Sequence, residues 1–232
     1  MGKVIALSAG HSDKDPGAVY NGLVERDIVE KIVALATPII KAHGVGVLNP
    51  PSSLNLVETI KWINDRSAQI NICTEIHINS SAKPNSGFGL EGWYYRGSEE
   101  SKSFASFLLD ALAAESGMSK KRGVKDERYA NVWGRLGFVH DTKPLACLME
   151  LGFINTDEDR AILSSEQGLY NLAKGVARGV VSYLGITWVA PKPEVKPDNQ
   201  ELIKLKELLA EKEVECQQLK DRLLQISRLS TL

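Results

Sequence analysis

Two histidines and two glutamates stand beside apolar segments, where distant side chains can converge on one site. His11 follows an apolar run, His77 lies within another, Glu25 follows a glycine-containing loop, and Glu150 interrupts a third run. Two imidazoles and one carboxylate form the ligand set of many catalytic zinc sites, which leave a fourth position to water. His11, Glu25 and His77 fit this set. The sequence therefore predicts a catalytic zinc site.

Such a site has the chemistry needed to hydrolyse an amide bond. Zinc lowers the pKa of a bound water to about 7 and polarises a carbonyl oxygen. A carboxylate that does not bind the metal must still take the proton of the water and pass it to the leaving nitrogen. Glu150 is the candidate, because an ionised carboxylate among apolar neighbours is costly unless it is paired or has a use.

Three apolar runs, at residues 4–8, 72–78 and 145–149, predict the strands that position these side chains. Their continuity is typical of central parallel strands that are covered on both faces. In open parallel sheets, ligands bind beyond the carboxyl ends of the strands, where these four side chains are expected. Pro38 predicts a kink or an early break in the first covering helix. Helical periodicity predicts the covering helices at residues 24–42, 56–70, 101–116 and 167–184.

This alternation predicts an α/β fold with a mostly parallel central sheet, helices on both faces and an additional C-terminal helix. We expect a catalytic domain at residues 1–188. Residues 189–198 contain three prolines and are interpreted as an extended linker. Residues 199–232 are expected to form a coiled-coil-like helix.

Charge and composition exclude several other classes of function. With 28 Lys plus Arg against 29 Asp plus Glu, the net charge is -1, so no overall field attracts nucleic acid. No run approaches the roughly 18 apolar residues of a membrane helix, so no membrane insertion is expected. The short apolar start, which ends at Gly10, does not fit a secretory signal, and we expect synthesis in the cytoplasm. Cys73, Cys147 and Cys216 are interpreted as free thiols.

The local sequences around the four residues resemble the zinc-dependent N-acetylmuramoyl-L-alanine amidases, from Val4 to about Leu184. The resemblance implies one Zn²⁺ per chain, held by His11, Glu25 and His77, with Glu150 as the catalytic residue. The elements that carry it, in chain order, are Gly10-His11-Ser12, Asp15-Pro16-Gly17-Ala18 followed by Glu25, Ile76-His77-Ile78-Asn79, and Glu150-Leu151-Gly152-Phe153.

The resemblance also implies a substrate. Members of this family hydrolyse the amide between the lactyl carbonyl of N-acetylmuramic acid and L-alanine in peptidoglycan, by attack of zinc-bound water. The short domain is similar to phage endolysins, so the enzyme is expected to act on a host cell wall after release. Candidate substrate contacts are Asn79, Trp93, Tyr95, Arg122 and Lys125. The aromatic rings could offer flat apolar surface, and the cations could meet the carboxylates of the stem peptide.

Several residues near the predicted site also have ordinary structural interpretations. The run Trp93-Tyr94-Tyr95 fits strand packing as well as a binding surface. Glu75, two residues before His77, is interpreted as half of an ion pair with a neighbouring strand. His43 is interpreted as the C-terminal cap of a helix, and His140 as a loop residue that could border the site.

One departure from the family pattern concerns the residue that orients His11. The family often has an acidic residue two or three places before its first histidine, where this chain has Ser8 and Ala9. A metal-binding histidine normally donates a hydrogen bond from the N–H of its second ring nitrogen to such a group. The partner of His11 is therefore left open by the sequence.

The segment from Asn199 to Arg228 has neither proline nor glycine and shows a heptad pattern. We expect self-association of two or more chains through this helix. Docking onto wall or membrane and folding back onto the catalytic domain are the alternatives, and the mixed charges disfavour the membrane. The two core positions hold Leu202, Leu209, Cys216 and Leu223, and Leu205, Lys212, Leu219 and Ile226.

Two other functions are compatible with much of this pattern. A zinc peptidase that cuts within the stem peptide would use the same metal chemistry. A non-catalytic wall-binding scaffold would keep the fold without the reaction, although all four chemical positions are filled here. The identity of the reaction products separates the first alternative from the amidase.

Overall fold

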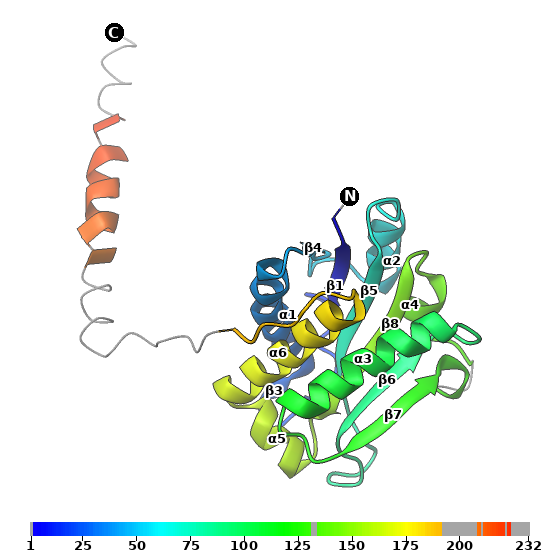
Figure 1. Ribbon diagram of the computed structural model, residues 1–232. Helices are drawn as coiled ribbons and strands as arrows, with labels where there is room; N and C mark the ends of the chain where they lie inside the picture. Colours follow the sequence, from blue (N-terminus) through cyan, green and yellow to red (C-terminus); the bar gives the residue numbers. More distant parts are fainter. Residues whose placement is uncertain (1, 131–133, 192–207, 210, 221, 224–232) are drawn as a thin grey trace. The chain divides into compact units, whose positions relative to one another are not determined.

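The computed structural model describes residues 2–130, 134–191, 208–209, 211–220 and 222–223 (Figure 1). The chain forms two compact units, Met1–Val189 and Ala190–Leu232. The first unit contains the central sheet and the helices that pack on it. In the part of the chain that the structure describes, no helix combines the length and apolar character needed to cross a membrane.

The central sheet has six strands in the order β4-β1-β5-β8-β6-β7. The first four of these are parallel to one another. Strand β6 runs antiparallel to β8, and β7 runs parallel to β6. The prediction of an α/β fold with a mostly parallel sheet is confirmed, and two reversed strands complete one side of that sheet. The strands are β1 (Val4–Ala9), β4 (Gly46–Leu48), β5 (Ile72–Asn79), β6 (Leu90–Tyr94), β7 (Lys121–Asp126) and β8 (Leu145–Phe153).

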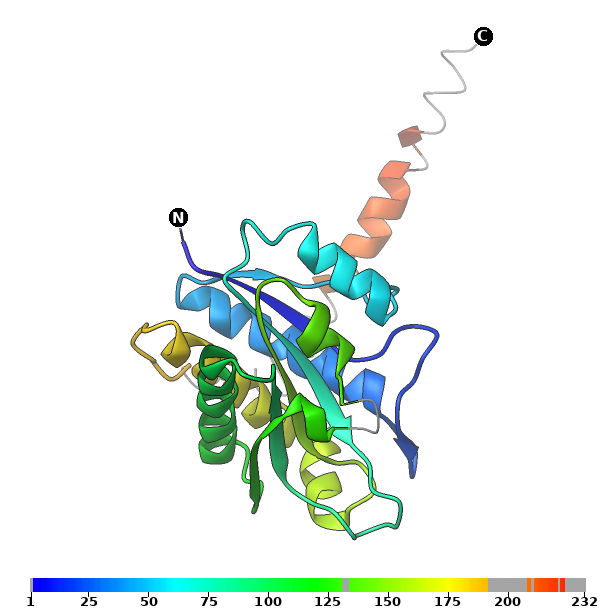
Figure 2. The same cartoon turned by 90° about the vertical axis from the view of Figure 1, so that its right-hand side faces the viewer.

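Three long helices, α1 (Glu25–Ala42), α3 (Glu99–Glu115) and α6 (Glu166–Tyr183), cover one face of the sheet (Figures 1 and 2). They bury the main apolar core against side chains of β1, β5 and β8. Glycines let α6 approach α3 closely, because a Cβ at Gly179 would lie only 2.7 Å from the Cα of Leu108. Helix α1 continues through Pro38 to its end, so the early break predicted there is not found.

Two shorter helices, α2 (Leu56–Asn64) and α4 (Gly137–Asp141), cover the opposite face. A capping box opens α2: Glu58 N–H donates to Asn55 Oδ1 at 3.1 Å, and Asn55 N–H donates to Glu58 Oε2 at 3.0 Å. The helix ends at residue 64 rather than 70 because turns with i to i+3 hydrogen bonds follow it. The smaller core on this face consists of Ala6, Ile63, Ile70, Cys73, Phe138 and Ala146.

The remaining elements of the first unit lie at its margins. A two-stranded hairpin, β2 (Val19–Tyr20) and β3 (Leu23–Val24), precedes α1 and delivers the chain to the start of that helix. A 3-10 helix, η1 (Glu127–Tyr129), follows β7, and α5 (Asp157–Leu163) follows β8.

In the second unit, residues 190–191 have no regular secondary structure, and residues 208–209, 211–220 and 222–223 are helical. Within it, Leu209, Leu219 and Leu223 of the predicted heptad seam are exposed. The other leucines of the seam and most of the predicted linker lie outside the described residues. Self-association through this helix therefore stays a prediction.

Candidate metal centre

The carboxyl ends of the parallel strands bring together the four residues that the sequence singled out. His77 in β5 and Glu150 in β8 are direct neighbours in the parallel pairing of these strands. His11 lies two residues beyond the end of β1, and Glu25 is the first residue of α1. Side chains from positions far apart in the sequence thus meet at one edge of the sheet, which is where open α/β sheets bind their ligands.

His11, Glu25 and His77 form a compact cluster of potential metal ligands. One ligand atom from each lies within 4.8 Å of the others. Oε1 of Glu25 is 3.0 Å from Nε2 of His11 and 3.0 Å from Nδ1 of His77. The imidazole rings meet edge to face with their centroids 4.9 Å apart. Two ring nitrogens and a carboxylate oxygen converging in this way are a donor set that suits zinc.

The second polar atom of each of these side chains is held by another group. Nδ1 of His11 is 2.9 Å from Oδ2 of Asp15, and Nε2 of His77 is 3.2 Å from Oε2 of Glu75. Oε2 of Glu25 accepts a hydrogen bond from the N–H of Ala18 at 2.9 Å. A carboxylate on one ring nitrogen fixes the tautomer that offers the other nitrogen to a metal. Both histidines therefore have the outer support that zinc ligands need.

Asp15 and Glu75 differ from what the sequence indicated. The sequence left the partner of His11 open, and the structure assigns this place to Asp15, four residues after the histidine. The interpretation of Glu75 as an ion-pair partner of a neighbouring strand is wrong. Its carboxylate instead contacts His77 on its own strand and accepts a hydrogen bond from the Ser8 hydroxyl of β1 at 3.3 Å.

Two glycines leave the space that the cluster occupies. A Cβ at Gly10 would lie 2.4 Å from Cε1 of His77. A Cβ at Gly17 would lie 2.5 Å from Nε2 of His11 and 2.6 Å from Oε2 of Glu25. Any larger residue at either position would push a ligand away. The glycines of the two sequence elements around His11 therefore have a steric role in forming the site.

Opposite charges stabilise the cluster in the absence of a metal ion. Burial lowers the pKa of His77, but hydrogen bonds with Glu25 and Glu75 outweigh this effect and raise the pKa well above its usual value. The same balance of burial against hydrogen bonds with Glu25 and Asp15 raises the pKa of His11. Burial raises the pKa of Glu25, but its hydrogen bonds with both histidines lower it overall. The cluster therefore favours positive charge at its centre, which a divalent cation supplies.

Glu150 lies beside this cluster without belonging to it. Its Oε2 atom is buried and has no hydrogen-bond partner among the residues that the structure describes. Burial raises the pKa of Glu150 to about 7, with His77 lowering it and the charges of Glu25 and Glu91 raising it. A carboxyl group with a pKa in this range can both accept and donate a proton near neutral pH.

Glu91 is a buried carboxylate at the site that the sequence analysis missed. It lies in β6, directly opposite Glu150 in the antiparallel pairing with β8. Arg122 and Lys125 of β7 both donate to its Oε2 atom, Lys125 at 2.7 Å, and Asn79 donates to Oε1 at 3.3 Å. Three of the predicted substrate contacts therefore converge on Glu91. A glutamate inside the apolar stretch before Trp93 was the available signal.

The predicted aromatic contacts occupy two different environments. Trp93 is 9% exposed and packs against Val139 and Leu148, so strand packing describes it better than a binding surface. Tyr95 is 38% exposed, and its ring lies 5.3 Å from the ring of His140. It lines a separate cavity near the start of β8 rather than the one that contains the metal ligands.

The two remaining histidines have structural partners. His43 caps the C-terminus of α1, with Nδ1 2.8 Å from the carbonyl oxygen of Ile39, as the sequence indicated. His140 lies in α4 rather than in a loop, and its Nδ1 is 2.9 Å from Oε1 of the buried Glu127. Neither residue belongs to the metal cluster.

A cavity of about 310 Å³ opens over the cluster on the face that α2 and α4 cover. One part of its wall consists of His11, His77, Glu75 and Glu150. The start of α2 and the start of α4 contribute further wall residues. Its size is within the range of small-molecule sites. The arrangement can hold a metal ion, admit a substrate beside it and present one carboxyl group for proton transfer.

Comparisons with known proteins agree with this geometry. The family described as N-acetylmuramoyl-L-alanine amidase matches residues 5–182. The endolysin of Bacillus phage SPP1 is 32% identical over 212 residues, which cover 86% of this chain and 74% of that protein. The N-acetylmuramoyl-L-alanine amidase LytC of Bacillus subtilis is 28% identical over 189 residues, 79% of this chain and 36% of that protein.

A solved structure shares the fold. The catalytic domain of CwlV, an N-acetylmuramoyl-L-alanine amidase from Bacillus (Paenibacillus) polymyxa var. colistinus, superimposes with a TM-score of 0.69 at 27% identity. The match covers 80% of this chain and 99% of that domain. The family match at residues 5–182 lies within the first unit.

Proposed function

Because this chain belongs to the N-acetylmuramoyl-L-alanine amidase family, we propose that it cleaves the amide between the lactyl carbonyl of N-acetylmuramic acid and L-alanine, using one zinc ion. The observation that carries the proposal is the position of Glu150. Its free buried oxygen lies next to a cluster of three ligands whose outer atoms are all held by other groups.

His11, Glu25 and His77 hold the zinc ion in this proposal, and Asp15 and Glu75 orient the two histidines. When bound, zinc polarises the amide carbonyl and makes water acidic enough to react near neutral pH. Glu150 accepts the proton of the attacking water and delivers it to the amide nitrogen as the C–N bond breaks. The products are a free lactyl carboxylate and a stem peptide with L-alanine at its amino terminus.

Arg122 and Lys125 bring positive charge to the same region. Each donates to Glu91, and Arg122 retains further N–H groups after that contact. Carboxylates of the stem peptide are suitable acceptors for these groups. We assign them an orienting role toward the substrate, with Glu91 fixing their position.

The test is digestion of purified peptidoglycan with and without a chelator, followed by analysis of the new end groups. The proposal expects new alanine amino termini together with lactyl carboxyl groups, and loss of both products after chelation. Cuts within the stem peptide would instead identify a peptidase, and binding without any cleavage would identify a scaffold.

Replacement of Glu150 by Gln separates proton transfer from metal binding. The Glu150→Gln variant is expected to lose about 10²- to 10⁴-fold in rate, the usual contribution of general acid–base catalysis. It is expected to retain one zinc per chain by elemental analysis. A matched control is Glu158→Gln in α5, which removes the same charge from an exposed position. Full activity of Glu150→Gln would contradict the assignment.

We further propose that the chain acts as a phage endolysin, made in the cytoplasm and active on the host wall after release. The similarity to the SPP1 endolysin over most of both chains supports this role. Expression in a bacterial cytoplasm is expected to leave cells intact until a membrane pore is opened by a co-expressed pore protein or by solvent. Lysis without such a pore would contradict this role while leaving the amidase activity in place.

A further inference from the structure

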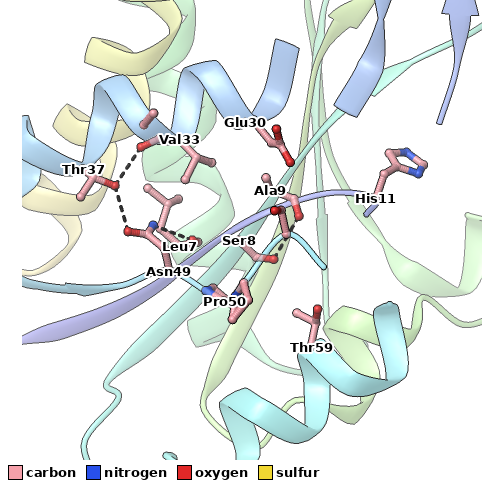
Figure 3. Close-up of a pocket in the computed structure, with 13 residues that line it drawn as sticks. Leu7, Ser8, Ala9, His11, Glu30, Val33, Thr37, Asn49, Pro50 and Thr59 are labelled. Atoms are coloured by element: carbon pink, nitrogen blue, oxygen red, sulfur yellow. Dashed lines mark hydrogen bonds between the residues drawn. The ribbon is translucent and has the colours of Figure 1, made fainter. Parts of the chain in front are cut away.

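A second cavity, of about 350 Å³, opens beside the metal centre at the carboxyl end of β1 (Figure 3). Helix α1 forms one wall, and the loop at residues 49–52 forms the other. The cavity shares His11 and Thr59 with the cavity that contains Glu150. A substrate held at the metal centre can therefore extend from one cavity into the other.

The walls of this second cavity are fixed by hydrogen bonds of their own. Asn49 donates to the carbonyl oxygen of Leu7 at 3.0 Å, which ties the loop to the end of the sheet. The Thr37 hydroxyl lies 2.8 Å from the carbonyl oxygen of Val33 and 3.3 Å from Oδ1 of Asn49. Two prolines, Pro50 and Pro51, follow Asn49 and restrict the backbone of the loop. The cavity is preformed, because Thr37 and Asn49 tie its two walls to each other and to the sheet.

Glu30 is different from the other residues that line this cavity. It is the one carboxylate among them, and its side chain extends from α1 towards Ala9 at the end of β1 (Figure 3). Among the described residues, none forms a hydrogen bond or an ion pair with it. Arg26, one turn earlier on α1, donates its hydrogen bonds to Asp27, at 2.7 Å, and acts on Glu30 only through its charge. A half-buried carboxylate that accepts no hydrogen bond in a preformed cavity favours a cationic ligand.

The position of Glu30 matches the reach of the substrate. It follows the metal ligand Glu25 by five residues on the same helix, which is about 7.5 Å along the helix axis. An extended peptide advances about 3.3–3.6 Å per residue, so the third residue of the stem lies roughly 10 Å from the scissile amide. The stem peptide of peptidoglycan carries a diamino acid at that third position. Its flexible side chain ends in a primary ammonium group, which extends beyond the peptide backbone and can turn towards Glu30.

We propose that this cavity binds the third residue of the stem peptide, with Glu30 as the counter-ion of its side-chain ammonium group. The inference rests on the proposed amidase function and adds the substrate feature that the enzyme selects. The lining residues include no Phe, Tyr or Trp, which favours a peptide over a sugar ring as the occupant.

The test uses three soluble N-acetylmuramoyl tripeptides that differ in the charge and bulk of the third side chain. One carries lysine, one Nε,Nε-dimethyl-lysine, which keeps the charge, and one Nε-acetyl-lysine, which loses it. Every sugar amine in them is acetylated, so the stem supplies the one ammonium group. Wild-type enzyme, Glu30→Gln and the control Glu158→Gln are compared by kcat/KM for release of the alanine amino terminus.

We expect wild-type enzyme and Glu158→Gln to cleave the acetylated substrate about fivefold or more slowly than the two charged ones. Glu30→Gln is expected to lose activity on the charged substrates by a similar factor and to treat all three alike. A wild-type enzyme that does not discriminate, or a Glu30→Gln variant that still does, would overturn the assignment while leaving the amidase function intact. No release of alanine termini from any substrate would overturn both.

Discussion

Glu91 and Glu150 face each other across the antiparallel pairing of β6 with β8, so the two carboxylates share one face of the sheet. Arg122 and Lys125 direct their charges to Glu91. The repulsion between the two carboxylates therefore acts mainly on the ionised form of Glu150. Burial raises the pKa of Glu150 most, and neighbouring negative charges raise it further. The pair divides its roles: one carboxylate anchors cations, and the other is available for proton transfer.

This pairing makes Glu91→Gln informative. In the proposed mechanism Glu150 acts as a base in its ionised form, so activity is expected to fall as the pH drops through its pKa. Removing the charge of Glu91 lowers that pKa, and the acidic limb of the kcat/KM profile is expected to move to lower pH. The rate itself is expected to fall about tenfold or more, because Arg122 and Lys125 lose their anchor.

The matched control is Asp110→Asn in α3. It removes the exposed ion-pair partner of Lys121, which lies on the same strand, β7, as Arg122 and Lys125. It is expected to leave the profile and the rate unchanged. An acidic limb that stays in place in Glu91→Gln, or that moves to higher pH, would remove Glu91 from the electrostatics of the site.

Asp15→Ala tests the support of the first histidine. Loss of the carboxylate on Nδ1 of His11 frees the ring to rotate and to change tautomer. Zinc affinity is expected to fall about 10- to 100-fold, the usual effect of removing such a partner. Competition with a chromophoric chelator measures it. Asp13→Ala, two residues earlier in the same loop, serves as the control, and equal losses in both variants would argue against a specific role for Asp15.

Gly10→Ala tests whether the site depends on empty space. The added methyl group would lie 2.4 Å from Cε1 of His77, so the ring must move or the strand end must shift. We expect a loss of bound zinc and a cost of about 1–3 kcal/mol in the free energy of unfolding. Gly2→Ala, which has no atom within 4 Å of its new carbon, is the control. A fully loaded and active Gly10→Ala protein would show that the cluster can adjust.

Removing the metal is expected to reverse the pH dependence of stability around neutrality. In the metal-free protein, the pKa values of His11 and His77 are raised above the value of about 6.5 in the unfolded chain. Protonation of these two histidines therefore stabilises the folded state fully below about pH 6.5. This stabilisation is lost as the pH rises through their pKa values in the folded protein. Glu150, with a pKa raised to about 7, acts in the same direction.

Zinc binding has the opposite dependence, because the histidines must lose their protons to bind the ion. As the pH rises from about 6 to about 8, the melting temperature of the chelated protein is therefore expected to fall. The difference in melting temperature between the zinc-bound and the chelated protein is expected to increase over the same range. Melting curves at several pH values, with and without zinc, provide the measurement. If the melting temperatures of both forms changed in parallel with pH, protonation of the histidines would not replace the positive charge of the metal ion.

Much of the site could be predicted from local sequence. The three apolar runs that became β1, β5 and β8 are buried on both faces, so their pattern is unambiguous, and their carboxyl ends carry His11, His77 and Glu150. Glu25 was placed correctly at the start of a helix. The roles of these residues as zinc ligands and proton acceptor stay predictions until a metal is bound and activity is measured.

The missing features depend on contacts that a local pattern does not encode. Asp15 reaches His11 through a loop in which residue 11 itself has a left-handed backbone, with φ of 70°. Glu91 meets Glu150 because β6 reverses its direction relative to β8, and the apolar pattern of a strand does not specify its direction. Arg122 and Lys125 reach Glu91 because β7 pairs with β6, so their sequence position suggested a substrate contact but not this shared anchor.

His77 and Glu150 occupy matching positions on adjacent parallel strands, joined by the backbone hydrogen bonds in the middle of the sheet. Adjacent strands are held about 4.8 Å apart, and this spacing hardly varies as a protein moves. Surface loops open and close on their own, whereas the interval between His77 and Glu150 is set by the sheet itself. Under the proposed mechanism, the spacing between the metal centre and the proton-transfer group is therefore fixed before the substrate binds, and no domain closure is needed to form it.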